Sequence, residues 1–250
     1  MKTIKYFLQF GIITFMASTI LLQSCKKANE TDTDSVEVLK NSIAYVYKTD
    51  NSDGLAFKTL MEENDCNVKL IEKSAISLNN FKTYNLIVID QNTDVSGWTG
   101  TWTNADTSAL QAGGKPMLLM GIGGLQYAAK IGNTTNYLKS ASFYDNKFFV
   151  ADKSSVMYKK PFVISVPAST PAVTLYSANV LSTGLSVHVG EAPLSVSLLG
   201  KFGVAPEYYP FTFEKNRYVN FGFSKGVAAM TQDGKNFMVN LVYYLGNFKY

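Results

Sequence analysis

The sequence has few of the residues on which most catalytic and metal-binding sites depend. Its 250 residues include two cysteines (Cys25 and Cys66), one histidine (His188) and one arginine (Arg217). Two cysteines cannot form a disulfide framework or a cysteine-rich zinc site, and a single histidine argues against a histidine-based metal site or triad. We therefore expect no metal and no cofactor, and we expect Cys66 to be a small structural residue.

Positive charge is not concentrated anywhere in the chain. The 23 lysine and arginine residues against 19 acidic residues leave a net charge of only +4. Recognition of phosphates and bases depends heavily on arginine, and no basic stripe is present, so we expect no nucleic-acid partner. Hydrophobic residues make up 46% of the chain and aromatic residues 13%, which excludes disorder as the main state and provides for one sizeable core.

The first 25 residues have the pattern of an export signal. Lys2 and Lys5 make the start positive, and residues 6–22 are uncharged and mostly apolar. A transmembrane anchor is the alternative, but this run is marginal for a hydrocarbon core of roughly 30 Å. The run ends in Leu22-Gln23-Ser24-Cys25, which resembles the lipobox of bacterial lipoproteins. That resemblance implies that Cys25 is acylated, as by palmitate, and becomes the mature N-terminus.

The residues after the lipobox predict where the protein resides. Lys26 follows Cys25, and no aspartate stands there to suggest retention in the inner membrane. The resemblance therefore implies an outer-membrane lipoprotein that faces either the periplasm or the cell exterior. Residues 26–40 are polar and lack aromatic side chains, so they are expected to form a flexible tether. Residues 41–250 are expected to form a single domain.

Strand and helix patterns alternate through most of that domain. The predicted strands are 42–48, 68–72, 84–90, 117–120 and 217–223, and the predicted helices are 55–63, 104–112 (with Asn104 as N-cap), 125–131 and 233–245. Several of these strands are continuously apolar, which is typical of strands buried on both faces of a parallel sheet. The pattern predicts an α/β protein with a mainly parallel sheet.

The pattern changes between residues 148 and 213. Six of the seven prolines fall in this stretch, together with short strand-like runs at 162–166 and 196–199. We expect a β-rich insertion that covers one end or edge of the sheet.

Two segments resemble class I glutamine amidotransferase-like domains. The strand 117–120 is followed by Gly121-Ile-Gly-Gly-Leu-Gln126 and a helix, which looks like the nucleophile elbow of those domains. Residues 218–224, followed by a final helix, look like the end of those domains. The likeness covers about 42–131 and 217–246 and is greatest to non-catalytic, trehalose-utilisation-type relatives. It implies a flavodoxin-like, three-layer fold with a mainly parallel sheet.

The catalytic residues of that family are missing from the matching positions. The family's elbow cysteine falls on Gly123, and the elbow is one residue shorter than usual before Gln126. The family's Phe-His-x-Glu falls on 223–226, so that Ser224 and Gly226 stand for the histidine and the glutamate. Amide transfer needs a thiolate, a base and a group that orients the base. We therefore expect no glutaminase chemistry.

The glycines of the elbow form the first candidate binding site. Gly121, Gly123 and Gly124 follow a buried strand and precede a helix, whose N–H groups and dipole favour a carboxylate, a phosphate or a sugar hydroxyl. Ligands of parallel sheets bind at the carboxyl ends of the strands, where this turn is expected. A dinucleotide fingerprint is excluded, because Gln126 stands at its third glycine position. The alternative is a tight turn that binds nothing.

Aromatic residues at the same edge form the second candidate. Trp98 and Trp102 lie in the loop after strand 84–90, and Tyr127 follows the glycines. Exposed aromatic rings on a loop suit stacking on sugar rings or on a protein partner. The alternative is that the rings are buried and hold the loop to the surface.

Acidic residues and His188 leave a second function open. Asp90 and Asp94 are expected at the same edge, with Asp50 and Asp53 after the first strand, where turn and capping roles explain them more simply than a metal.

The leading prediction for the function is a non-catalytic binding or scaffolding module for glycans or an envelope protein, with Asp90 among its ligand-binding residues. The alternative is an envelope hydrolase that acts on glycans through Asp90, Asp94 or His188.

Overall fold

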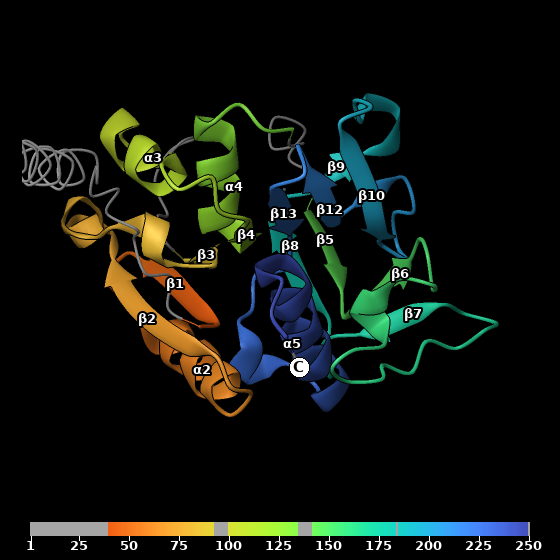
Figure 1. Ribbon diagram of the computed structural model, residues 1–250. Helices are drawn as coiled ribbons and strands as arrows, with labels where there is room; N and C mark the ends of the chain where they lie inside the picture. Colours follow the sequence, from red (N-terminus) through yellow and green to blue (C-terminus); the bar gives the residue numbers. More distant parts are fainter. Residues whose placement is uncertain (1–39, 93–99, 135–141, 184, 250) are drawn as a thin grey trace, which may run out of the picture. The chain divides into compact units, whose positions relative to one another are not determined.

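A mixed sheet of nine strands runs through the computed structural model, which describes residues 40–92, 100–134, 142–183 and 185–249 (Figure 1). The strand order is β2-β1-β3-β4-β13-β12-β10-β6-β7. Cys25, Asp94 and Trp98 lie outside the described residues, as does nearly all of the expected tether.

The first five strands in this order form a parallel core. They are β2 (Asn67–Glu72), β1 (Ser42–Tyr47), β3 (Leu86–Ile89), β4 (Met117–Met120) and β13 (Tyr218–Phe221). Because β13 is the fifth strand of the parallel set, the order is 2-1-3-4-5, which is the flavodoxin-like order. The predicted fold class is therefore confirmed.

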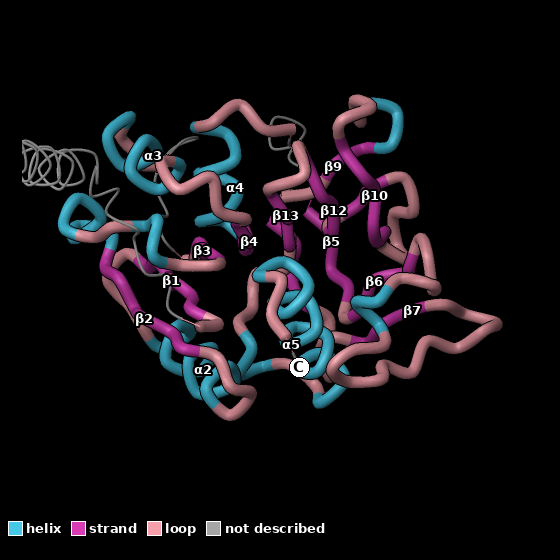
Figure 2. Tube along the Cα trace, in the orientation of Figure 1, coloured by secondary structure: helices cyan, strands magenta, loops and turns pink. Residues whose placement is uncertain are grey.

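Helices cover both faces of the parallel core (Figures 1 and 2). The helices are α2 (Ser52–Glu62), α3 (Asn104–Gln111), α4 (Gly121–Lys130) and α5 (Gln232–Gly246). Successive strand residues point to opposite faces, so each strand contributes to two separate apolar clusters. In β1, Ile43 packs with α2 and α5, whereas Ala44 packs with α3 and α4. No helix in the described ranges is long and apolar enough to cross a membrane.

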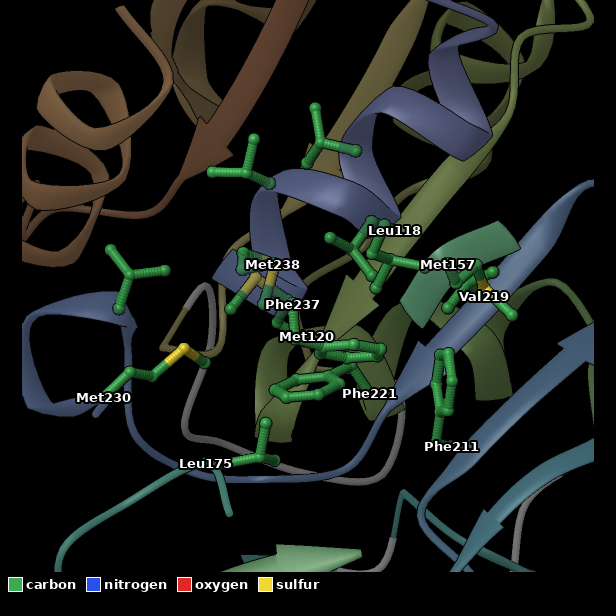
Figure 3. Close-up of a cluster of buried hydrophobic side chains, with 14 of the residues drawn as sticks. Leu118, Met120, Met157, Leu175, Phe211, Val219, Phe221, Met230, Phe237 and Met238 are labelled. Carbon is green, nitrogen blue, oxygen red and sulfur yellow. The ribbon is translucent and has the colours of Figure 1, made fainter. Parts of the chain in front are cut away.

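The cluster beneath α2 and α5 is the larger of the two (Figure 3). Met120 of β4 and Phe221 of β13 meet Phe237 of α5 there, and Phe211 of β12 joins them. The rings of Phe211 and Phe237 lie 5.4 Å apart at 87°, an edge-to-face contact. These rings bind the antiparallel half of the sheet to the parallel core.

The β-rich segment extends the main sheet and also forms two small separate sheets. β12 (Phe211–Glu214), β10 (Val196–Lys201), β6 (Lys147–Val150) and β7 (Ala172–Thr174) continue the sheet in antiparallel pairing. Two small sheets pair β5 (Ser142–Asp145) with β8 (Val180–Thr183), and β9 (Val187–His188) with β11 (Tyr208–Tyr209). Antiparallel strands thus begin at Ser142 instead of residue 148. Short 3₁₀ helices complete the described elements: η1 (Lys73–Leu78), η2 (Phe81–Thr83), η4 (Val156–Tyr158), η5 (Val189–Glu191) and η6 (Val227–Ala229).

Two local predictions are wrong. Residues 162–166 do not form a strand, because their backbone groups bond elsewhere: the Phe162 N–H donates to Asn240 Oδ1 at 2.9 Å, and the Ile164 N–H donates to Tyr158 O at 2.8 Å. The N-cap of α3 is Thr103, not Asn104, since the Thr103 hydroxyl accepts from the Asp106 N–H in a reciprocal capping box.

Candidate functional site

The sheet has one topological switch point among its parallel strands. β1 connects onward to β2 on one side, and its neighbour β3 connects to β4 on the other. Open α/β sheets bind ligands outside the carboxyl ends of the strands at such a point. The segments that leave β1, β3 and β4 here carry Asp53, Asp90 and Gly121, so the structure brings the predicted edge together.

Asp90 is a buried acid at the end of β3. Its Oδ1 accepts a 2.5 Å hydrogen bond from the Tyr45 hydroxyl, and its side chain is fully buried. Burial raises the pKa of the Asp90 carboxyl to about 6, although hydrogen bonds from Tyr45 and from the next two backbone N–H groups act in the opposite direction. Burial and the Asp90 carboxylate together hold the pKa of Tyr45 well above its usual value. Asp90 is therefore the described acid at this edge that titrates near neutral pH.

Asp53 ties the start of α2 to the loop after β3. Its Oδ2 accepts hydrogen bonds from Gln91 Nε2 at 2.5 Å and from Asn92 Nδ2 at 3.2 Å. Asp50 accepts from the Ser52 N–H at 2.9 Å, a turn contact at the helix start. In the part of the chain that the structure describes, no group of three or more His, Cys, Asp or Glu side chains could hold a metal ion.

The elbow turns at Gly121. Helix α4 begins directly at Gly121, which has a φ of +50° at the junction of strand and helix, instead of at residue 125 as predicted. The sharp turn between strand and helix therefore lies at Gly121, and Gly123 lies inside the first turn of α4. A Cβ at Gly121 would lie 2.7 Å from Gln91 Cβ, which is too close for a side chain.

The helix start is less open than the sequence suggests. The Gly123 N–H donates to the Gln91 backbone carbonyl at 2.6 Å, and Gly121, Gly123 and Gly124 are all buried. A Cβ at Gly124 would lie 2.5 Å from the Leu119 carbonyl carbon, so this glycine allows α4 to pack closely on β4. The Gly123 N–H is therefore already used by the loop after β3.

The segment after β13 is also packed closely against neighbouring residues. A Cβ at Gly226 would lie 2.3 Å from Asp53 Oδ1, so a larger residue has no room there. The Ser224 N–H donates to Leu181 O in β8 at 3.1 Å, so a strand of the insertion covers this position. Ser182 of β8 is fully buried, and its Oγ has no hydrogen-bond partner among the described residues.

Trp102 and Tyr127 lie side by side but are buried. Their ring centroids are 5.1 Å apart at 81°, with exposed fractions of 3% for Trp102 and 0% for Tyr127. The Lys73 ammonium lies over the indole, 4.7 Å from its centroid. These two rings therefore hold the loop in place, and the indole face is covered by a flexible lysine.

A hollow of about 350 Å³, not predicted from the sequence, opens beside this lysine. It is lined by Lys48, Thr49, Glu72, Lys73, Ser74, Thr101 and Asp106. These residues leave the carboxyl ends of β1 and β2 and the segment that enters α3. The only signal in the sequence is the cluster of charged and hydroxyl residues directly after strands 42–48 and 68–72.

His188 lies away from these strands in the chain's β-rich segment. Its Nδ1 accepts from the Gly190 N–H at 3.1 Å, and its ring packs edge-on to Tyr208 at 5.1 Å between centroids. His188 pairs with Tyr208 in the β9–β11 sheet, which is separate from the sheet whose strand β3 leads to Asp90, and Gly190 lies in η5.

Cys66 is buried where α2 gives way to β2. Its Sγ donates to Asn64 O at 3.5 Å, and burial raises the pKa of the thiol to about 12. A thiol in this environment is unreactive at neutral pH.

Comparison with known proteins finds similarity in structure alone. No family model and no curated protein matches the sequence. A protein from Thermoplasma acidophilum, described as part of a GMP synthase, shares 12% identity at a TM-score of 0.55, covering 84% of this chain and 96% of its own. PurLQS from Thermotoga maritima shares 10% identity at a TM-score of 0.51, covering 83% and 100%. A glutamine amidotransferase from the same organism shares 8% at 0.50, covering 83% and 99%. The described chain has the α/β fold of class I glutamine amidotransferase domains.

Proposed function

We propose that this chain is a lipid-anchored protein of the outer membrane whose amidotransferase-like domain binds a ligand without catalysing amide transfer. One observation supports the absence of amide transfer: neighbouring side chains and backbone pack directly against the glycines of the elbow. Gln91 packs against Gly121 and bonds to Gly123, while Asp53 packs against Gly226. A domain that still used this turn for a nucleophile would need space above it, whereas here the loop after β3 packs directly against the start of α4.

The hollow beside Lys73 is the proposed binding site. Its lining combines two lysines, two carboxylates and three hydroxyl groups, so donors and acceptors are balanced and formal charges cancel. A neutral ligand rich in hydroxyl groups matches this lining, which favours a glycan over a nucleotide or an acidic peptide.

The anchor follows from Cys25, which lies outside the described residues. Labelling cells with a palmitate analogue should mark the wild-type chain and leave Cys25→Ser unmarked. Fractionation should then place the wild type in the outer membrane and release the variant. Labelling of both chains alike would contradict the anchor.

Binding is tested by titrating the purified full chain with neutral oligosaccharides and following tryptophan fluorescence. Capture of an envelope protein, with no response to any oligosaccharide, would favour scaffolding through a protein partner instead.

A glycan hydrolase is the second candidate, and the state of Asp90 favours it. A buried carboxyl with a pKa near 6, bonded to Tyr45 at the ligand-binding edge, has the properties of a general acid or base. Turnover of an envelope or dietary glycan that Asp90→Asn abolishes would support this candidate. Asp94 and His188 would be tested in the same assay, and inactivity over a broad panel would count against it.

A further inference from the structure

A second hollow lies between α2 and α5. These two helices cover the face of the sheet opposite α3 and α4 (Figure 1). The volume of the hollow is about 420 Å³, within the range of small-molecule sites. Its lining comes from α2 and the residues after it, from η6, from α5 and from the loop at 162: Ala56, Thr59, Leu60, Glu63, Asn64, Phe162, Val227, Ala228, Gln232, Lys235, Asn236 and Val239. We call it the α2–α5 groove.

The walls of the α2–α5 groove are held in place by hydrogen bonds. The Tyr243 hydroxyl of α5 donates to Asn64 O, just beyond α2, at 2.6 Å. Asn240, fully buried in α5, donates to Phe162 O at 2.7 Å and to Met157 O at 2.9 Å, and it accepts from the Phe162 N–H at 2.9 Å. At the other end of α2, Gly226 packs directly on Asp53. The groove is therefore preformed, so little ordering of the protein opposes binding.

The lining has an apolar part and one charge of each sign. Leu60 and Phe162 are half-buried and contribute apolar surface, and Val227 and Val239 are almost fully buried. Glu63 comes from the α2 side and Lys235 from the α5 side. Neither side chain has a hydrogen bond or ion pair with another described residue.

We propose that the α2–α5 groove binds a small zwitterion of the amino-acid type, either a free amino acid or a dipeptide with an apolar side chain. The ligand's ammonium group pairs with Glu63, its carboxylate pairs with Lys235, and its side chain packs on Leu60 and Phe162. Each partly exposed charge gains a charge-assisted hydrogen bond, while the ligand's apolar carbons leave water. This site is distinct from the hollow at the carboxyl edge and does not depend on the function proposed for it.

Isothermal titration calorimetry of the full chain in detergent tests the proposal with L-leucine, Leu-Leu and N-acetyl-leucine amide. The zwitterions should bind saturably. The blocked amide, which lacks both charges, should have an affinity that is lower by about tenfold or more. Glu63→Gln and Lys235→Gln should each weaken the zwitterions about tenfold or more. Absence of zwitterion binding, or equal binding of the blocked amide, would overturn the proposal.

Glu62→Gln is the matched control. Glu62 neighbours Glu63 but pairs with Lys58 at 3.0 Å and does not line the groove. The proposal requires unchanged binding in Glu62→Gln, and an equal loss in all three variants would overturn it. Thermal unfolding of each variant separates loss of binding from loss of fold.

Discussion

The backbone carbonyl of Gln91 accepts a 2.6 Å hydrogen bond from the N–H of Gly123 and thereby closes the elbow from the β3 side. In an active elbow, free N–H groups of this kind stabilise the charge that develops on a reacting carbonyl. Here the N–H is used within the protein, and the Gln91 side chain also lies against Gly121. The loop after β3 thus packs directly against the start of α4.

Gly121→Ala should destabilise the protein more than Gly114→Ala. Both glycines have a positive φ, +50° and +63°, but nothing lies within 4 Å of a Cβ added at Gly114, whereas Gln91 Cβ lies 2.7 Å from one added at Gly121. We expect a loss of about 1 kcal/mol at Gly114 and about 2–4 kcal/mol at Gly121. Urea denaturation measures both, and equal losses would mean that Gln91 does not fill the elbow.

Gly226 and Asp53 should be coupled energetically. Gly226→Ala forces the Asp53 carboxylate away from Gln91 and Asn92, because the new Cβ would lie 2.3 Å from Asp53 Oδ1. In an Asp53→Ala background that clash is gone, so the same substitution should be milder by about 1 kcal/mol or more. A double-mutant cycle measured by denaturation gives the coupling, and strict additivity would contradict the packing described.

Asp90 should make the protein less stable as the pH rises. Its folded pKa of about 6 exceeds the ordinary value of 3.8, so the folded protein keeps a proton that the unfolded chain has released. Stability from this group is therefore complete below about pH 4, falls by about 3 kcal/mol as the pH rises to about 6, and then stays level. Asp90→Asn should remove this slope in denaturation curves measured from pH 4 to 7, and an unchanged slope would contradict the assignment.

Tyr45→Phe provides an independent check on the same group. The Tyr45 hydroxyl donates to Asp90 and favours its ionised form, so removing the hydroxyl should raise the pKa of Asp90 further. Carbon NMR of the Asp90 carboxyl follows the titration directly. A pKa that falls or stays constant would show that the hydrogen bond does not act on Asp90 as described.

Cys66 should be inert in the folded protein. Its thiol is buried with a pKa of about 12, so almost no thiolate exists at pH 8. In a Cys25→Ser chain, a thiol-specific chromogenic reagent should label the native protein slowly and the unfolded protein at once. Rapid stoichiometric labelling of the native chain would contradict the burial of Cys66.

The sequence predicts the parallel core well because both faces of each strand are apolar. The continuously apolar runs at 86–89 and 117–120 favour burial on both faces, and their alternation with helices predicts a parallel sheet. The flavodoxin-like fold is implied by the resemblance to amidotransferase-like domains. Residues 162–166 look like a strand, yet their backbone partners include Asn240, which is far away in the chain. No local pattern reveals such a partner.

The candidate site was harder to predict for the same reason. A run of glycines shows that a turn exists, but not which glycine adopts the positive φ, which in the structure is Gly121. The hollow beside Lys73 joins the ends of two strands to the segment before α3, and its lining appears only when these segments meet. Burial of Trp102 and Tyr127 likewise depends on packing between α3 and α4.

Tryptophan fluorescence of the full chain, titrated with neutral oligosaccharides, tests the central claim most directly. Trp98 and Trp102 are the only tryptophans, and Lys73 covers Trp102 beside the proposed site. We predict a saturable change that Glu72→Gln and Lys73→Ala weaken about tenfold or more, while the distant control Lys58→Ala leaves it unchanged. Absence of a response to every oligosaccharide, or a response that survives both substitutions, would contradict ligand binding at the carboxyl edge of the sheet.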